Sequence, residues 1–259
     1  MNNGRATREL ARRTLTTVGA AAVCAGAQAG QFDATLGVDL SRGGYGLEQR
    51  TSILALPIRL RWSEAPWSFA VSGSQLRLNT PARLIGDTPV GDGTERRRVS
   101  GIGDVYVAIT RQFDPVGGVF IDATWRTKIP TADFDKGLGT GKFDHLVRVD
   151  AFWPLNDWLP FAALGYQFTG KRAGQRLRNA FRTSLGMARS WRRWQFAVSV
   201  DYREKTSAAG TDALELVPSA NLRLSRQWTV GGYNVIGFTD GSPDIAIGVQ
   251  LTWKPNAIR

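Results

Sequence analysis

Residues 244–253 read DIAIGVQLTW, and this stretch decides the fold. Its large apolar side chains occupy every second position: Ile245, Ile247, Val249, Leu251 and Trp253. The positions between them carry small or polar side chains, and this period of two predicts a β-strand with one apolar face. Such a face is covered either by a second sheet, as in a soluble sandwich, or by lipid, as around a membrane barrel.

The same alternation recurs along the whole chain. We count twelve such segments, an even number, as is usual for single-chain outer-membrane barrels. The pattern is clearest in 194–203 and weaker in 143–153, 158–168 and 180–191. The predicted strands are 32–42, 51–62, 67–74, 103–113, 119–129, 143–153, 158–168, 180–191, 194–203, 214–224, 228–238 and 244–253.

The connections between these strands alternate in length. Short turns such as 63–66 and 154–157 alternate with longer connections, which include 76–102, 130–142 and 169–179. Short periplasmic turns and longer external loops are typical of outer-membrane barrels, whereas a soluble sandwich has no reason to alternate them. Both ends of the barrel domain are therefore predicted to lie on the periplasmic side.

Tryptophan gives an independent indication of a membrane. Indole prefers the interface between lipid and water, where its ring is half buried and its N–H stays hydrated. The sequence therefore predicts an all-β fold, a 12-stranded antiparallel transmembrane β-barrel with short periplasmic turns and longer extracellular loops, in the cell outer membrane. Eight of the nine tryptophans lie at the predicted periplasmic strand ends: Trp62, Trp67, Trp153, Trp158, Trp191, Trp194, Trp228 and Trp253.

The first 29 residues have the composition of a signal peptide. Four arginines precede a weakly apolar run at 15–25, and residues 27–29, Ala-Gln-Ala, fit a cleavage site. The alternative interpretation is an N-terminal amphipathic helix. We expect a signal peptide over 1–29 and a single outer-membrane β-barrel domain over 30–259.

Residue types that carry catalysis or bind metals are scarce. The only cysteine, Cys24, falls in the predicted signal peptide, which excludes disulfides and thiol chemistry from the mature chain. With His145 as the only histidine, neither a zinc site nor a cofactor is expected. His145 has outward parity and no positioned partner, so we do not expect an enzyme. The segment GLGTGK lacks the serine or threonine that follows the lysine of a phosphate-binding loop.

The chain is basic, with a formal net charge of +11. The predicted signal peptide contributes four arginines and one glutamate, so the mature chain carries 11 − 3 = +8. Its cations are scattered and form no nucleic-acid-binding module, so nucleic acid is not an expected partner. The expected partners are the lipid bilayer with its outer-membrane lipid headgroups, and a small-molecule solute.

Strand parity assigns a set of charged side chains to the barrel interior. Charges inside a barrel must pair or meet water. Many of their inward neighbours are small, and twelve strands favour a narrow conduit, so we predict that these side chains line a pore. The alternative is a salt-bridge network that fills the lumen. The candidates are Asp104, Asp122, Arg126, Lys128, Arg148, Asp150, Arg182, Asp201, Arg203 and Glu215.

Three segments carry a resemblance to a known family: GIGDVYVAITRQF at 101–113, KIPTADFDKGLGTGKFD at 128–144 and LPFAALGYQFTG at 159–170. They resemble the outer-membrane proteins named for the MetA pathway of phenol degradation. That family shows a Gly-x-Gly-Asp strand, a Pro-Thr-Gly-Asp loop with a Gly-x-Gly-Thr-Gly-Lys segment, and a Leu-Gly-Tyr strand. Ala132 replaces the usual loop glycine. The matching residues are Gly101, Gly103, Asp104, Pro130, Thr131, Asp133, Gly137, Gly139, Thr140, Gly141 and Lys142.

The resemblance implies a transport-type barrel, and the family name points to aromatic or other hydrophobic compounds. The tail over 254–259 is a departure, because barrels normally end on the aromatic residue that the barrel-assembly machinery reads. We expect an outer-membrane channel or transporter for small solutes. The alternatives are a non-conducting structural or surface-interaction barrel and, less in keeping with the sequence, an outer-membrane enzyme.

Overall fold

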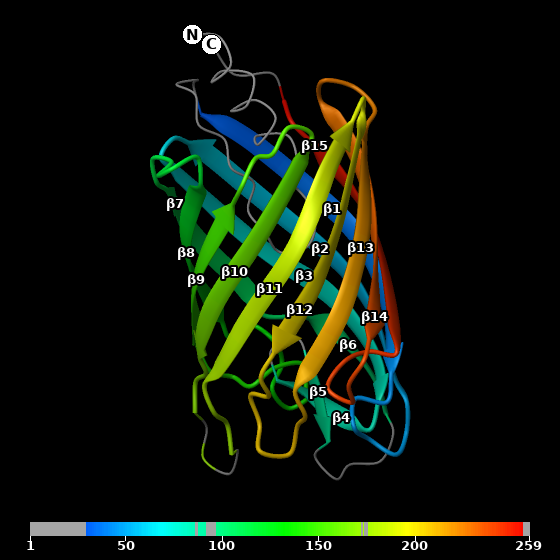
Figure 1. Cartoon of the computed structure of the whole chain (residues 1–259). Coiled ribbons are helices and arrows are strands. Elements are labelled where there is room, and N and C mark those ends of the chain that lie inside the picture. Colours follow the sequence, from blue (N-terminus) through cyan, green and yellow to red (C-terminus); the bar gives the residue numbers. More distant parts are fainter. Residues whose placement is uncertain (1–29, 86–87, 92–96, 172, 174–175, 256–259) are drawn as a thin grey trace, which may run out of the picture.

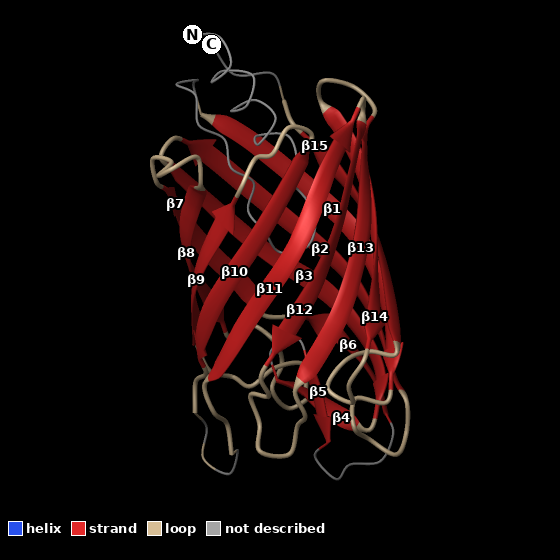
Figure 2. Ribbon diagram, in the orientation of Figure 1, coloured by secondary structure: helices blue, strands red, loops and turns tan. Residues whose placement is uncertain are grey.

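The alternating stretches form long antiparallel strands that wrap into a closed barrel in the computed structural model (Figure 1). Figure 2 shows that the described part consists of strands and loops, and it holds no helix long and apolar enough to cross a membrane. The predicted signal peptide lies outside the described residues. The structure describes residues 30–85, 88–91, 97–171, 173 and 176–255.

The main sheet has thirteen strands, and β6 and β7 follow one another along a single stave beside β3, so the barrel has 13 − 1 = 12 staves. The predicted number is confirmed. The first strand pairs with the second and with the last, which leaves the sheet without a free edge. The strands are β1 (Gln31–Gly43), β2 (Thr51–Glu64), β3 (Trp67–Thr80), β4 (Ala82–Ile85), β5 (Thr88–Gly91), β6 (Arg97–Ile102), β7 (Val105–Gln112), β8 (Phe120–Ile129), β9 (Asp144–Phe152), β10 (Trp158–Phe168), β11 (Ala180–Trp191), β12 (Trp194–Arg203), β13 (Ala213–Arg223), β14 (Trp228–Gly237) and β15 (Ile245–Trp253).

The outer face of the barrel is apolar, as the alternation predicts. Leu36, Leu185 and Val249 are 59%, 69% and 53% exposed, although each is a residue type that water-soluble proteins bury. Along β12, Val198 and its outward neighbours are exposed, whereas Ser199 points inward and is buried. A belt of this composition requires lipid around it.

The tryptophan belt forms at one end of the barrel. Trp191 pairs with Trp194 across one turn, and Trp228 pairs with Trp253 where β14 meets the last strand. Two outward arginines occur in this belt. The Arg189 guanidinium lies 4.8 Å from the Trp158 ring centroid, and that of Arg111 lies 5.4 Å from the ring of Trp67. Stacking on indole keeps these cations at the membrane interface.

The extracellular end differs from the prediction. We predicted a loop over 76–102, but β3 continues to Thr80 and β6 begins at Arg97, and the two strands pair there. Between them β4 and β5 form a separate hairpin. The period of two persists in this region but its polarity reverses, because Arg77 is exposed outside whereas Leu78 is buried inside.

Strand parity shifts by one residue between β6 and β7. Gly101 points inward before the shift and Tyr106 points inward after it, so one extra residue is accommodated at Gly103 and Asp104, as in a β-bulge. The Gly103 N–H still donates to the Ser74 carbonyl oxygen at 2.8 Å. A Cβ at Gly103 would lie only 3.1 Å from Ser74 Oγ, so glycine fits best here.

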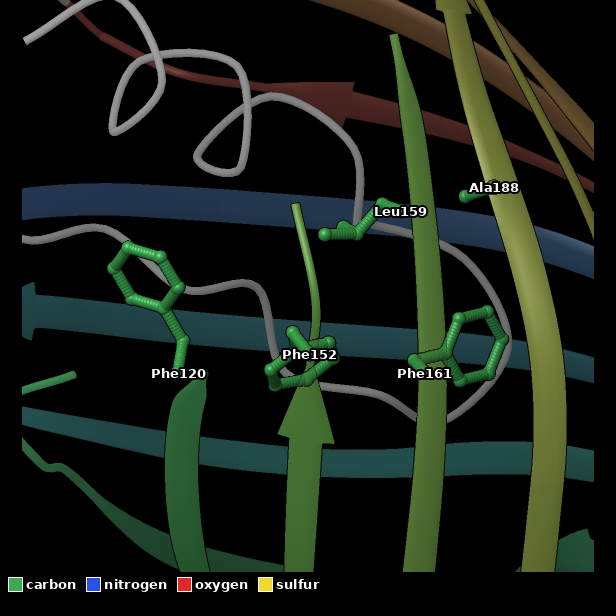
Figure 3. Close-up of a cluster of buried hydrophobic side chains, with 5 residues drawn as sticks. All are labelled: Phe120, Phe152, Leu159, Phe161 and Ala188. Atoms are coloured by element: carbon green, nitrogen blue, oxygen red, sulfur yellow. The ribbon is translucent and has the colours of Figure 1, made fainter. Parts of the chain in front are cut away.

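Two apolar clusters lie on the inner wall. Figure 3 shows the periplasmic cluster, to which four neighbouring strands, β8 to β11, contribute Phe120, Phe152, Leu159, Phe161 and Ala188. The extracellular cluster packs the β4 hairpin and the loop after β8 against β3, and its members are Leu76, Leu78, Leu84, Ala132 and Leu138.

Candidate functional site in the barrel interior

Lys128 is at the centre of a buried ionic cluster. Its ammonium Nζ lies 2.8 Å from Asp144 Oδ2 and donates to Thr140 Oγ1 at 2.8 Å. Asp104 Oδ2, at 3.3 Å, makes an ionic contact that lacks hydrogen-bond geometry. Lys128 is 2% exposed, so a charge that would be costly to bury alone is held by two carboxylates. We call Lys128, Asp104, Asp144 and Thr140 the lysine cluster.

The lysine cluster joins the bulge of the fourth stave to the loop over 130–143. Asp104 Oδ1 accepts the Ala132 N–H at 3.1 Å. The Thr131 hydroxyl donates to the Gly103 carbonyl oxygen at 3.0 Å and accepts the Val105 N–H at 3.0 Å. Two of the three segments that carry the family resemblance, 101–113 and 128–144, thus contact one another here.

Further contacts hold this loop over the lumen. Leu138 is 1% exposed in the extracellular cluster. A Cβ at Gly139 would approach the two carboxylate oxygens of Asp104 to 3.0 and 3.1 Å, so the loop packs closely on the bulge. Asp144 Oδ1 also accepts the Gly170 N–H at 2.8 Å, which ties the next loop to the same cluster.

Other predicted pore-lining charges face inward and have partners on the same wall. The Arg148 Nη2 lies 2.9 Å from Asp150 Oδ1. The Arg203 Nη2 lies 3.6 Å from Glu215 Oε1. Arg182 donates from Nε to Gln167 Oε1 at 2.9 Å. These contacts join neighbouring residues along or across strands of the wall. Arg203 also donates from Nη1 to Thr88 Oγ1 of the β4–β5 hairpin.

Three predicted charges have a different environment. The Arg126 guanidinium lies 5.1 Å from the Tyr106 ring centroid, and Asp201 Oδ2 accepts the Ser199 hydroxyl at 3.2 Å. Asp122 faces Asp150 in register and is 2% exposed. Its two carboxylate oxygens have no hydrogen-bond partner among the residues that the structure describes.

The extracellular half of the lumen contains a chamber of about 270 Å³. Its polar groups come from distant parts of the chain, and the Tyr233 hydroxyl hydrogen bonds the Asp39 carboxylate. The polar lining residues are Asp39, Ser41, Ser74, Asp104, Tyr106 and Tyr233. Its apolar lining includes Ile53, Ala55, Leu76, Leu84, Leu138 and Val235. The bulge residues Gly103 and Asp104 also border it.

Several inward side chains were not among the predicted candidates. Arg61 donates from Nε to Asp33 Oδ2 at 2.9 Å, and both residues are buried near the periplasmic end. Arg59, two residues earlier on β2, lies within electrostatic reach of Arg61 and Arg126. The alternation in the sequence places Arg59, Arg61, Asp33 and Asp39 at inward positions of their strands, so these residues could have been found from it. Nothing in the sequence indicates that Asp39 contacts Tyr233.

His145 keeps the outward position that its parity predicts. Its Nδ1 lies 3.0 Å from Thr127 Oγ1, and its ring centroid lies 5.6 Å from that of Trp125. Both neighbours are outward residues of β8, so the histidine belongs to the outer face. Within the described ranges, no group of three or more His, Cys, Asp or Glu side chains is arranged to hold a metal ion.

No family model and no curated protein matches the chain by sequence. Among solved structures, the COG4313 outer membrane channel from Pseudomonas putida F1 matches with a TM-score of 0.68 at 10% identity, over 88% of this chain and 96% of that chain. The NanC porin matches with a TM-score of 0.54 at 12% identity, over 86% of this chain and 100% of that chain. The beta domain of the Bordetella autotransporter Brka gives 0.50 at 16% identity, over 87% and 99%.

At such identities these likenesses concern the fold, and they confirm the predicted outer-membrane β-barrel. The apolar outer face and the tryptophan belt agree with that location, because both are suited to lipid and to its interface with water.

Proposed function

We propose that the chain is a narrow outer-membrane channel for small solutes, and that it carries compounds with one aromatic ring or a similar hydrophobic body. The chamber supports this proposal most directly. An apolar cavity of about 150 Å³ accepts benzene, so the chamber of about 270 Å³ has room for one substituted ring. A mostly apolar lining with a few convergent polar groups is typical of small-molecule sites.

The polar groups of the chamber suit a ring that carries a hydroxyl or a similar substituent. Tyr233, Asp39 and Tyr106 offer a donor and acceptors beside the apolar lining. The inward charges of the periplasmic half, Arg148 and Asp150 among them, would then line a hydrated exit. Uniform apolar walls would retain such a solute, whereas a polar exit lets it leave.

The family resemblance supports the same proposal. Gly103 and Asp104, which belong to the resembling Gly-x-Gly-Asp motif, border the chamber, and so does Leu138 from the glycine-rich loop. We therefore propose membership of the MetA-pathway family of phenol degradation. In this proposal the peptide over 1–29 directs export, the barrel-assembly machinery inserts the barrel, and lipid headgroups surround its rim.

Planar bilayers test the proposal through the current of single barrels. The wild-type barrel is expected to conduct KCl, and phenol added on the extracellular side is expected to interrupt the current. Ala55→Phe places a ring into the chamber and should lower the conductance and remove the interruptions. Ala34→Phe adds the same ring to the lipid face and should leave both unchanged.

Two outcomes would contradict the proposal. A folded wild-type barrel that conducts no ions would be a structural or surface-interaction barrel. Interruptions by phenol that persist in Ala55→Phe would show that the solute does not occupy the chamber.

A further inference from the structure

A groove of about 550 Å³ crosses the lipid-facing surface over β12 to β15. Aromatic side chains of Trp194 and Phe196 form one rim, and Ile247 forms the other. The floor between them consists of small residues, including Ala220 and Gly232. The lining of the groove is therefore mostly apolar, and its flat floor fits a flat apolar molecule better than the surrounding surface, from which side chains project.

The strand ladder is interrupted beneath this groove. β13 and β14 pair at Leu216↔Ile236 and again at Ser219↔Tyr233, but no pair is formed at Val217 or Pro218. Proline has no N–H to donate, so it cannot complete the ladder on its donor side. A seam with fewer hydrogen bonds is easier to part than its intact neighbours.

Asn234 lies beside the same gap. Its side chain points outward and is exposed toward lipid, within the groove. A primary amide in the hydrocarbon region is costly, and polar residues there usually serve a function. At this place it can donate to the backbone carbonyls that a parted ladder would leave open.

The wall between the groove and the chamber is thin. Tyr233 lines both spaces, from the lipid side through the groove and from the lumen through the chamber. Its ring lies on Gly248 of the next strand, where an added Cβ would collide with the ring and with Asp39. Tyr233 therefore lies between the chamber and the membrane side of the wall.

We propose that the seam between β13 and β14 at Pro218 is a lateral portal through which apolar solutes pass from the chamber into the lipid. This inference rests on the proposed function. A ring without polar substituents loses favourable surroundings when it enters the charged periplasmic half, whereas lipid keeps it in apolar surroundings. Rotation of Tyr233 away from Asp39 would open the path, so polar and apolar solutes would leave the chamber by different routes.

A reversible disulfide across the seam tests the portal. Val217→Cys and Val235→Cys place two cysteines opposite one another across the interrupted ladder, in the same register as the strand pairs on either side of it. The control pair, Ser199→Cys with Val217→Cys, joins register partners across the intact ladder between β12 and β13. The readouts are uptake of radiolabelled toluene by intact cells that produce the barrel, and KCl conductance in planar bilayers.

The oxidised seam pair is expected to lower toluene uptake to the level of cells without the barrel, and a reductant should restore it. The control pair should leave uptake unchanged, and each pair should conduct KCl equally before and after reduction of its disulfide. Gly232→Phe gives a second test that spares the ladder, because a Cβ there meets only the Gly248 carbonyl oxygen at 3.6 Å and the ring would fill the groove. Ala151→Phe adds a ring to the lipid face elsewhere and is its control.

Barrel-dependent toluene uptake that persists with the seam disulfide formed and in Gly232→Phe would overturn the portal and leave the channel proposal intact. Wild-type barrels that conduct KCl but do not raise toluene uptake would also overturn the portal. Wild-type barrels that neither conduct nor raise uptake would overturn the portal and the proposed function together.

Discussion

At the scale of single residues, the buried ammonium of Lys128 holds the extracellular end of the barrel together. Its ammonium is the only cation that an ion pair places beside Asp104 and Asp144 in the described part of the chain. Without it, two carboxylates would be buried with like charge close together, which costs more than the ion pairs themselves contribute. Thr140, the third partner, brings the glycine-rich loop to the same point.

Replacement of the ammonium tests this account. Lys128→Met keeps the length of the side chain but leaves the two carboxylates uncompensated, and should lower the free energy of unfolding by about 3–5 kcal/mol. Urea unfolding of the barrel in lipid vesicles measures the change. Adding Asp104→Asn and Asp144→Asn should recover much of the loss, because the buried charges are then removed together.

The matched control for this prediction is Lys136→Met. Lys136 also contacts a carboxylate, that of Asp133 at 3.3 Å, but their side chains are 56% and 42% exposed. An exposed pair of this kind contributes at most about 1 kcal/mol. Equal losses in Lys128→Met and Lys136→Met would contradict the role of burial.

At the scale of strands, the alternation of apolar and polar residues occurs in two environments, with the apolar residues facing lipid in one and the barrel interior in the other. Along most strands the apolar positions face lipid, so the period of two predicted both the strands and their outward faces. Beyond Val71 on β3 the apolar residues are Leu76 and Leu78, which face inward against the β4 hairpin. The sequence alone suggested a loop there, because the rule for lipid-facing residues fails where the outer face meets water.

The facing of β12 gives a prediction for a whole strand. Val198 points to lipid at mid-strand, so Val198→Arg should cost about 2–4 kcal/mol of stability in the bilayer. Ser184→Arg, on the neighbouring strand, points into the lumen opposite Asp201 and should be tolerated, with an altered conductance. Urea unfolding in vesicles measures both variants, and an equal loss of stability would show that the assigned faces are wrong.

For the whole molecule, parity predicted which residues face the lumen but not which of them meet. The chamber combines Asp39 from the first strand, Tyr233 from near the end of the chain and Leu138 from a loop. Which of these side chains contact one another depends on barrel closure, on the stagger of the strands and on how loops fold inward. The alternation of apolar residues in the sequence predicts none of these. The inward charges could therefore be named from the sequence, whereas their pairing and the chamber required the structure.

The pairing of the inward charges determines how the barrel should select ions. Arg61 with Asp33, Arg148 with Asp150 and Arg203 with Glu215 each combine one charge of either sign. Arg59 and Arg126 lie near one another, and neither has an ion pair with a carboxylate of the described part of the chain. We infer that these two arginines give a hydrated passage a local positive potential that favours anions.

The double variant Arg59→Gln with Arg126→Gln should therefore reduce the preference for chloride over potassium, measured as the reversal potential across a KCl gradient. The change should be large near 0.1 M salt and small near 1 M, because the screening length falls from about 10 Å to about 3 Å. Arg148→Gln with Asp150→Asn removes one charge of each sign and should leave the reversal potential unchanged. Equal shifts in the two double variants would refute the assignment of selectivity to Arg59 and Arg126. If the wild type conducts no ions and the loss of Arg59 and Arg126 lowers only thermal stability, the inward charges form a structural network instead of a pore lining.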